Sequence, residues 1–288
     1  MAGSAEELRE LLVLEELDLN LFRGPRPRTE RQRVFGGQVA AQAVVAATRT
    51  VDPELRIHSL HSYFLRPGDP AVPIIYDVER IRDGRSLATR RVLARKHGRP
   101  IFYLSCSLQV PEEGLTHQDR MPDVIPPDMA VPIAELVKRR GPEAAEEWQR
   151  EWSGLDARYV GTSALGLAED PDRPARAQLW LRVDGDLGEN ELDHTAAFAY
   201  ASDLTLIGAA LVPHDIVITS PRLQAASLDH AVWFHRPFRA DEWWLYDQVS
   251  PFAGGGRGLS TARVFTESGE LVATVAQEGL IRVRKPRA

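Results

Sequence analysis

The most apolar stretch of the chain is residues 193–212, DHTAAFAYASDLTLIGAALV. Its apolar residues recur with the 3.6-residue period of an α-helix, and one stripe contains Ala196, Ala199, Tyr200, Leu206, Ile207 and Ala210. Because the other faces are also mostly apolar, the pattern predicts a single helix that is buried all round. Asp193 is a favourable N-cap residue, and Pro213 is expected to end the helix.

The rest of the chain alternates between shorter helical patterns and strand patterns. Helical periodicity predicts helices at 4–12, 38–50 and 142–152. Alternation of apolar and polar residues predicts strands, with Gly-containing turns between several of them. The predicted strands are 17–21, 58–65, 72–80, 86–95, 101–109, 157–160, 175–183, 227–235, 242–250, 259–266 and 271–283.

The order of a strand, a helix and about four strands occurs twice. The motif YFLRP at 63–67 resembles WFHRP at 233–237, and GRSL at 84–87 resembles GRGL at 256–259. The two offsets, 170 and 172 residues, agree closely. The chain therefore reads as a tandem duplication of a whole domain.

The duplication explains how an apolar helix can be buried. One helix packed on one antiparallel sheet leaves part of its surface uncovered, whereas two such units side by side can cover it. We therefore expect an α+β double hotdog, in which each of two tandem domains wraps an antiparallel sheet around a long helix. The predicted division is an N-terminal hotdog domain at 1–111, a Pro-rich linker at 112–140, and a C-terminal hotdog domain at 141–288 that carries the candidate functional residues identified below.

Composition limits the partners that the protein could bind and the cellular compartment in which it is expected. A net charge of −6 gives no general attraction to nucleic acid or anionic membranes. No uninterrupted apolar run reaches the ~18 residues of a membrane span. The single cysteine, Cys106, suits a reducing compartment. The first residues lack a secretory signal, and RVRKPRA at the C-terminus lacks a peroxisomal tripeptide, so a cytoplasmic location is expected.

Asp203 occupies the i+7 position of the apolar stripe. Burial of a carboxylate costs several kcal/mol unless it is paired or hydrogen-bonded, although Asp203 could also lie at a solvent-lined edge of the helix. A shift of 161 residues between the two copies places Asp203 on Gln42, and shifts of 170 and 171 place Ser227 on Ile57 and Gln277 on Cys106. The polar residues Asp203, Ser227 and Gln277 therefore all belong to the C-terminal copy. Gln277 also shares the apolar face of its predicted strand, where its amide needs partners.

Four longer motifs carry a family resemblance. These are VFGGQVAAQA (34–43), HSYFLRPGDPAVPIIYDVERIRDGRS (61–86), SLDHAVWFHRPFRADEWWLY (227–246) and AQEG (276–279). They resemble the acyl-CoA thioesterase II family of double-hotdog thioesterases. The resemblance implies hydrolysis of fatty acyl-CoA by a triad of Asp, Thr or Ser, and Gln, which falls here on Asp203, Ser227 and Gln277.

These residue types suit thioester hydrolysis. Asp203 can act as general base toward a water that Ser227 and Gln277 hold in line. Gly36, Gly37 and Gln38 could supply backbone N–H donors to the oxyanion from a helix N-terminus, or the glycines could serve only close packing. The phosphates of coenzyme A need cations, for which Arg257 and the arginines of 26–33 are candidates. No metal or other cofactor is expected.

Several alternatives stay open at this level. Ser227 could attack directly and form an acyl-enzyme, although no G-x-S-x-G motif is present and His230, three residues along the same predicted strand, should face away. His58 and His61 diverge on a strand and are interpreted as structural. A non-catalytic acyl-CoA-binding protein and a hotdog hydratase or dehydratase are the alternative functions. A homodimer or homotetramer is expected, because exposed sheet faces tend to pair.

Overall fold

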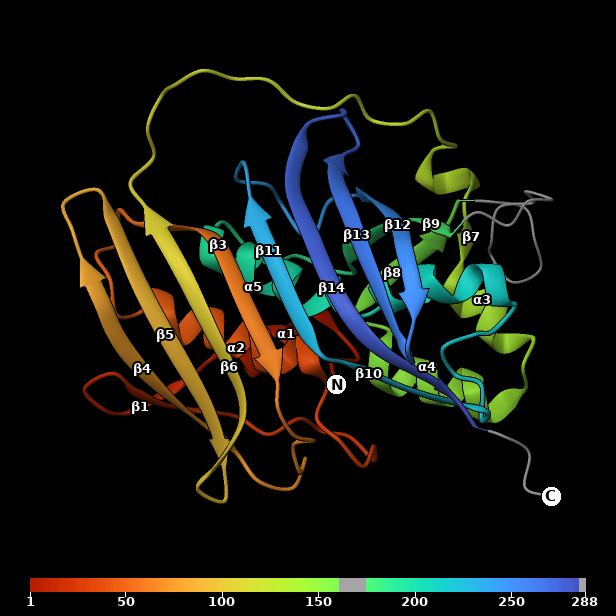
Figure 1. Cartoon of the computed structure of the whole chain (residues 1–288), viewed down its shortest axis with the longest axis horizontal. Helices are drawn as coiled ribbons and strands as arrows, with labels where there is room; N and C mark the ends of the chain where they lie inside the picture. Colours follow the sequence, from red (N-terminus) through yellow and green to blue (C-terminus); the bar gives the residue numbers. More distant parts are fainter. Residues whose placement is uncertain (161–174, 285–288) are drawn as a thin grey trace.

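The computed structural model describes residues 1–160 and 175–284, and its strands form one continuous antiparallel sheet (Figure 1). Strands β3 (Arg56–Phe64) and β11 (Asp229–Phe234) pair at the junction between the two halves, with His61 opposite Ala231. The order along the sheet is β1-β2-β4-β5-β6-β3-β11-β14-β13-β12-β9-β8-β7, and β10 pairs with β14.

The first half contains the helices and strands expected from its pattern, with one exception. Its elements are α1 (Ala5–Leu12), β1 (Glu15–Asp18), β2 (Leu21–Gly24), α2 (Gly36–Thr48), β3, β4 (Ile74–Asp83), β5 (Leu87–Lys96) and β6 (Arg99–Gln109). The single strand predicted at 17–21 is wrong. The chain turns there, with Asn20 in the left-handed region, so Leu17 and Leu19 are exposed and only the β1–β2 hairpin forms.

The second half begins with short elements and continues with long strands. Its elements are η1 (Pro127–Met129), β7 (Val131–Pro132), α3 (Ile133–Lys138), α4 (Pro142–Trp152), β8 (Leu155–Tyr159), β9 (Arg176–Val183), α5 (Glu191–Ser202), η2 (Leu206–His214), β10 (Leu223–Ser227), β11, β12 (Trp244–Gly254), β13 (Arg257–Thr266) and β14 (Leu271–Val283). The strand predicted at 227–235 is two strands, because the chain passes from β10 to β11 at Leu228.

Helices α2 and α5 pack against each other on one side of the sheet, behind the strands in Figure 1. Every residue of α2 from Gly37 to Ala47 is buried, as are nearly all residues of α5 from His194 onward. By length and composition Glu191–His214 could cross a membrane, but 78% of its apolar window lies inside the protein. The stretch is therefore a core element, as the duplicated pattern requires.

The long helix predicted at 193–212 is interrupted. Helix α5 ends at Ser202, Asp203 is its C-cap, and the chain resumes as the 3₁₀ helix η2. The N-cap is Asn190 rather than Asp193, and its side chain accepts a hydrogen bond from the Leu192 N–H. Asp is a weak helix former, and the Asp203 carboxylate is bonded to two strands instead of continuing the helical face. Pro213 lies within the end of η2, so it does not end α5.

The segment after β6 arches past the ends of the strands, at the top of the view, to the second half (Figure 1). The Trp180 indole N–H donates to the Ile125 carbonyl at 2.8 Å, and Arg263 forms an ion pair with Asp119 at 3.1 Å. Within the range predicted as the linker, β7 already pairs with β8. The domain division at 111 and 140 remains a prediction, and residues 285–288, part of the C-terminal RVRKPRA, lie outside the described residues.

Candidate active site

Asp203, Ser227 and Gln277 meet at one point, although they come from three different elements. The Ser227 hydroxyl at the end of β10 donates to Oδ1 of Asp203 at 2.7 Å. The Gln277 side-chain amide on β14 donates to the same oxygen at 2.5 Å. Asp203 is 7% exposed and Gln277 is 1% exposed. Two donors therefore converge on one oxygen of a buried carboxylate.

The start of helix α2, which belongs to the other half of the chain, packs against the Asp203 carboxylate. The backbone N–H of Gly37 donates to the Asp203 carboxylate. A Cβ at Gly36 would lie 2.6 Å from Oδ2 of Asp203, and one at Gly37 would collide with the carbonyl oxygen of Tyr200. Both positions therefore require glycine if α2 is to approach Asp203 and helix α5 this closely, and the choice between the two interpretations of the motif stays open. The positive end of the α2 dipole faces the carboxylate.

Burial controls the ionisation of Asp203. Desolvation raises its pKa from 3.8 to about 6, and hydrogen bonds from Ser227, Gln277 and the Gly37 N–H oppose that rise because they favour the charged form. No ion pair to Asp203 occurs within the described residues. A carboxylate with this pKa is ionised at neutral pH and is a stronger base than an exposed one, which is the property a general base needs.

Gln277 keeps one polar atom for a ligand. Its Nε2 is bonded to Asp203, whereas its buried Oε1 accepts no hydrogen bond from the residues that the structure describes. A buried amide oxygen without a donor costs about 1–3 kcal/mol. This acceptor is therefore suited to a donor molecule that binds beside Asp203.

The chain matches known acyl-CoA thioesterases along nearly its whole length. The family model for acyl-CoA thioesterase matches residues 171–280, and the model for the acyl-CoA thioesterase N-terminal domain matches 25–109. Acyl-coenzyme A thioesterase 8 of Homo sapiens is 39% identical, over 96% of this chain and 91% of that protein. The crystal structure of the acyl-CoA thioesterase II TesB2 from Mycobacterium marinum is 46% identical, with a TM-score of 0.82 over 96% of this chain and 99% of that one.

The chain belongs to the acyl-CoA thioesterase family. The resemblance stated from the motifs is confirmed, and with it the classification as an enzyme that hydrolyses thioesters. The α+β double-hotdog fold is confirmed as well. A protein with a hot dog fold from Alicyclobacillus acidocaldarius, at 20% identity, superposes with a TM-score of 0.76 over 96% of this chain and 98% of that chain, which bears on the fold alone.

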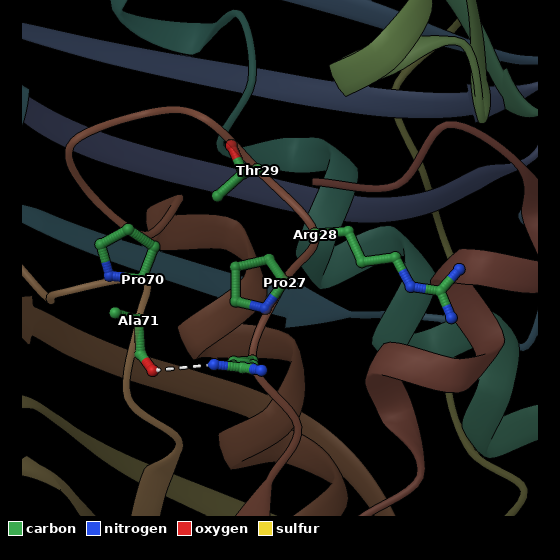
Figure 2. A pocket seen from close by; sticks show the side chains of 6 residues that line it. Pro27, Arg28, Thr29, Pro70 and Ala71 are labelled. Carbon is green, nitrogen blue, oxygen red and sulfur yellow. Dashed lines mark hydrogen bonds between the residues drawn. The ribbon is translucent and has the colours of Figure 1, made fainter.

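A cavity of about 470 Å³ lies beside the loop that leads into α2 in this thioesterase-family chain. The residues that line it are Arg26, Pro27, Arg28, Thr29, Pro70 and Ala71. This cavity is therefore separate from the point where Asp203, Ser227 and Gln277 meet. Figure 2 shows the rings of Pro27 and Pro70 at the cavity and the Arg28 side chain extending away from Pro70 and Ala71. Arg28 lies 3.8 Å from Glu7 and 3.5 Å from Glu10.

Arg26 is the more available cation of this cavity. It is exposed, and among the residues that the structure describes its guanidinium donates only to the Ala71 carbonyl, at 3.4 Å. The loop is tied to the opposite wall by the Val34 N–H, which donates to the Gly68 carbonyl at 2.9 Å. Gly36, which touches Asp203, lies two residues beyond Val34. The cavity and the site at Asp203 are therefore joined by one short, anchored segment.

The other candidate residues from the sequence, Arg257 and Gln38, each have a hydrogen-bond or ion-pair partner within the protein. Arg257 begins β13 after the predicted glycine hairpin, is half exposed, and is paired with Glu278 at 3.0 Å. The Gln38 side chain is buried, its amide donates to the Pro25 carbonyl at 3.3 Å, and its Oε1 has no partner among the described residues. Among the described residues no group of three or more His, Cys, Asp or Glu side chains could hold a metal ion.

The expectation that His230 faces away from the site is wrong. Alternation along one strand does not apply, because Ser227 closes β10 and His230 belongs to β11. The His230 ring points inward, and its Nε2 lies 2.8 Å from the hydroxyl of Ser202, the neighbour of Asp203. Sequence reasoning missed this residue, although a signal was present: an offset of 170 places His230 on Leu60, a buried apolar residue of the first copy.

Proposed function

We propose that this protein hydrolyses fatty acyl-CoA to a free fatty acid and coenzyme A. In this mechanism Asp203 activates a water molecule for direct attack on the thioester, and Ser227 and Gln277 position that water. The observation that carries the proposal is the convergence of two side-chain donors and one backbone N–H on a buried carboxylate whose pKa is about 6.

The geometry gives each group a task. Asp203 takes a proton from the water as the water oxygen bonds to the carbonyl carbon, and a tetrahedral intermediate forms. The negative charge on the former carbonyl oxygen is stabilised by the N-terminal end of α2, where the first-turn N–H groups of Gly36 and Gln38 have no intrahelical acceptors. The N–H of Gly37, the third candidate donor, is bonded to Asp203 instead. Expulsion of the coenzyme A thiolate, with return of the proton, completes the reaction.

A second mechanism has a specific observation in its favour. The Ser227 hydroxyl donates to Asp203, so the same carboxylate could deprotonate Ser227 and allow it to form an acyl-enzyme. Direct attack by water remains our proposal because Gln277 Oε1 supplies a second acceptor for a water beside Asp203. Mass spectrometry of the protein quenched during turnover distinguishes the two: an acyl adduct on Ser227 contradicts direct attack.

The coenzyme A end of the substrate needs a cationic subsite in an acidic protein. We propose that the cavity at Arg26 receives its phosphates, since no acidic side chain lines that cavity and its loop continues to the site at Asp203. Arg257 is the alternative, but its guanidinium is already paired with Glu278.

We also propose a cytoplasmic location, from the state of the single cysteine, and a homodimer or homotetramer, from exposed aromatic side chains on the sheet. The single cysteine, Cys106, is buried and unpaired, which suits a reducing compartment. Tyr63 and Trp233 are partly exposed on the neighbouring strands β3 and β11, where a second copy could cover them. Size-exclusion chromatography with light scattering tests the assembly.

The central test is release of the coenzyme A thiol from palmitoyl-CoA by the purified protein. Asp203→Asn should lower kcat by about 10³-fold, within the range of general-base catalysis, while the melting temperature stays within a few degrees. Asp193→Asn, at the other end of the same helix, is the matched control and should keep full activity. Equal activity in Asp203→Asn would remove Asp203 from the mechanism. Absence of thiol release with the wild-type protein across acyl-CoA chain lengths would instead favour a binding protein or a hydratase.

A further inference from the structure

The last two residues of the α5 segment, Ser202 and Asp203, are held by side chains from four strands. Ser227 on β10 and Gln277 on β14 bind the Asp203 carboxylate. His230 on β11 and Tyr246 on β12 bind Ser202 instead. The second pair plays no part in the mechanism described above, yet it acts on the residue next to the general base.

The contacts to Ser202 use both its side chain and its backbone. Its hydroxyl shares a hydrogen bond with His230 Nε2 at 2.8 Å, and its carbonyl accepts one from the Tyr246 hydroxyl at 2.9 Å. Ser202, His230 and Tyr246 are all completely buried. The carbonyl groups in the last turn of a helix have no intrahelical donors, so these two strands fix the point at which α5 ends and Asp203 leaves the helix.

His230 is itself held in place by the other half of the sheet. Its backbone carbonyl accepts a hydrogen bond from the Ser62 hydroxyl on β3 at 2.8 Å. The register of the β3–β11 pair, in which His230 lies opposite Ser62, produces this contact. The imidazole is therefore anchored to the central strand junction and presents Nε2 to Ser202.

Packing alone does not explain a histidine at this position. The equivalent residue of the first copy is Leu60, which fills a buried site of the same sheet with no polar atom. Burial lowers the pKa of His230 to about 4, so the ring is neutral at physiological pH, and its Nδ1 has no partner within the described residues. A buried nitrogen without a partner destabilises the fold. The compensating contact is the one to Ser202.

We propose that His230 is a positioning residue for the hydrolysis proposed above: through Ser202 it fixes the end of α5 and so the direction of the Asp203 carboxylate. A general base must be held close to its productive geometry, and a displacement of about 1 Å can cost 10²-fold in rate. His230 touches neither Asp203 in the described contacts nor the reacting atoms, so its effect is exerted only through Ser202.

Three substitutions of His230 test this inference. His230→Asn retains a polar group near the place of Nδ1 but does not reach Ser202, whereas His230→Gln reaches about as far as Nε2. We expect kcat to fall about 10–100-fold in His230→Asn and His230→Leu with KM within about twofold of wild type, and to be largely retained in His230→Gln. A role limited to packing would instead leave His230→Leu, the residue type of the first copy, with wild-type kcat.

A double-mutant cycle identifies the contact responsible. If His230 acts through Ser202, then Ser202→Ala lowers kcat similarly, and Ser202→Ala/His230→Leu is no slower than the slower single variant. Falls in kcat that multiply in the double variant would overturn the proposal. If every His230 variant fails to fold, kcat of Ser202→Ala tests the inference without them. A kcat equal to that of the wild type would contradict it.

Two controls separate this inference from the function on which it rests. His61→Gln alters an exposed histidine on β3, directly beside β11, and should leave kcat unchanged. Full activity in Asp203→Asn refutes the proposed role of Asp203 as general base, whereas an inactive Asp203→Asn together with a fully active His230→Leu refutes only the positioning role.

Discussion

Gly36 lies so close to Asp203 that a methyl group on it would come within 2.6 Å of the Oδ2 atom of the carboxylate. The two residues belong to different copies of the duplicated domain, at the start of α2 and the end of α5. The polar residues of the C-terminal copy therefore do not make a site by themselves. The first copy supplies a helix N-terminus as one wall of that site.

Gly36→Ala should damage the site directly. The added Cβ would meet Asp203 Oδ2 at 2.6 Å and the Phe64 ring at 2.7 Å, so either the carboxylate or the helix must move. We expect kcat for palmitoyl-CoA hydrolysis to fall about 10²-fold, as for other displacements of about 1 Å at a catalytic group. Steady-state kinetics with purified protein measure this effect.

Gly208→Ala is the matched control for that change. Gly208 lies in η2, close in sequence to Asp203, but a Cβ there would meet no atom within 4 Å and its backbone is not left-handed. The variant should keep wild-type kcat and lose no stability, because alanine restricts the unfolded chain more than glycine does. Equal losses in both variants would mean that the Gly36 contact has no special role.

Substitutions of Ser227 separate its hydroxyl from its size. Ser227→Ala removes the 2.7 Å hydrogen bond to Asp203 and should lower kcat about 10–100-fold. Ser227→Thr keeps the hydroxyl and should stay within a few fold of wild type, since the β-branch restricts the same group to fewer rotamers. Comparable activity in the alanine variant and the wild type would remove Ser227 from the proposed mechanism.

The rate should depend on pH through Asp203. The base must be ionised, and burial raises its pKa from 3.8 to about 6, so kcat/KM should be flat above about pH 7 and fall tenfold per unit well below pH 6. The Ser227 hydrogen bond lowers this pKa, so the acid limb of Ser227→Ala should move to higher pH. A rate profile that stays flat down to pH 4 would contradict Asp203 as the base.

The same raised pKa predicts a stability difference that depends on pH. The folded protein binds the Asp203 proton more tightly than the unfolded chain, so this group stabilises the fold at low pH and the contribution is lost as pH rises through about 6. Relative to Asp203→Asn, the wild type should gain about 2 kcal/mol of unfolding free energy between pH 8 and pH 4. Urea unfolding of both proteins across this range measures the difference, and a constant difference would refute the burial effect.

Substrates without the nucleotide test the proposed coenzyme A subsite. Arg26→Gln should raise KM for palmitoyl-CoA several fold and leave palmitoyl-pantetheine unaffected, because only the former carries phosphates. Arg120→Gln, in the exposed segment before η1, is the control and should change neither substrate. An increase in KM for both substrates would place Arg26 elsewhere than at the phosphates. If Arg257→Gln alone shows the selective loss, the subsite lies at the start of β13.

Local patterns were enough to predict most elements of this fold. Residues 142–152 form α4 as predicted, and the strand patterns at 86–95, 101–109 and 271–283 coincide with β5, β6 and β14 within a few residues. The repeated YFLRP and WFHRP motifs indicated the duplication, because each copy must solve the same packing problem. The polar residues that distinguish the copies then pointed to Asp203, Ser227 and Gln277.

Other features depended on contacts between distant segments. No periodicity reveals that the carboxylate of Asp203 leaves the helical face, since its partners are 24 and 74 residues away. The orientation of His230 depends on the crossing from β10 to β11, and the role of Gly36 on how closely α2 approaches α5. The sequence by itself determined most of the helices and strands, the duplication, and the residue types Asp, Ser and Gln of the candidate site. These features follow from short-range sterics and from the pattern of burial along the chain. The tertiary structure alone decided which groups touch Asp203, because that depends on how two halves of one sheet close around two helices.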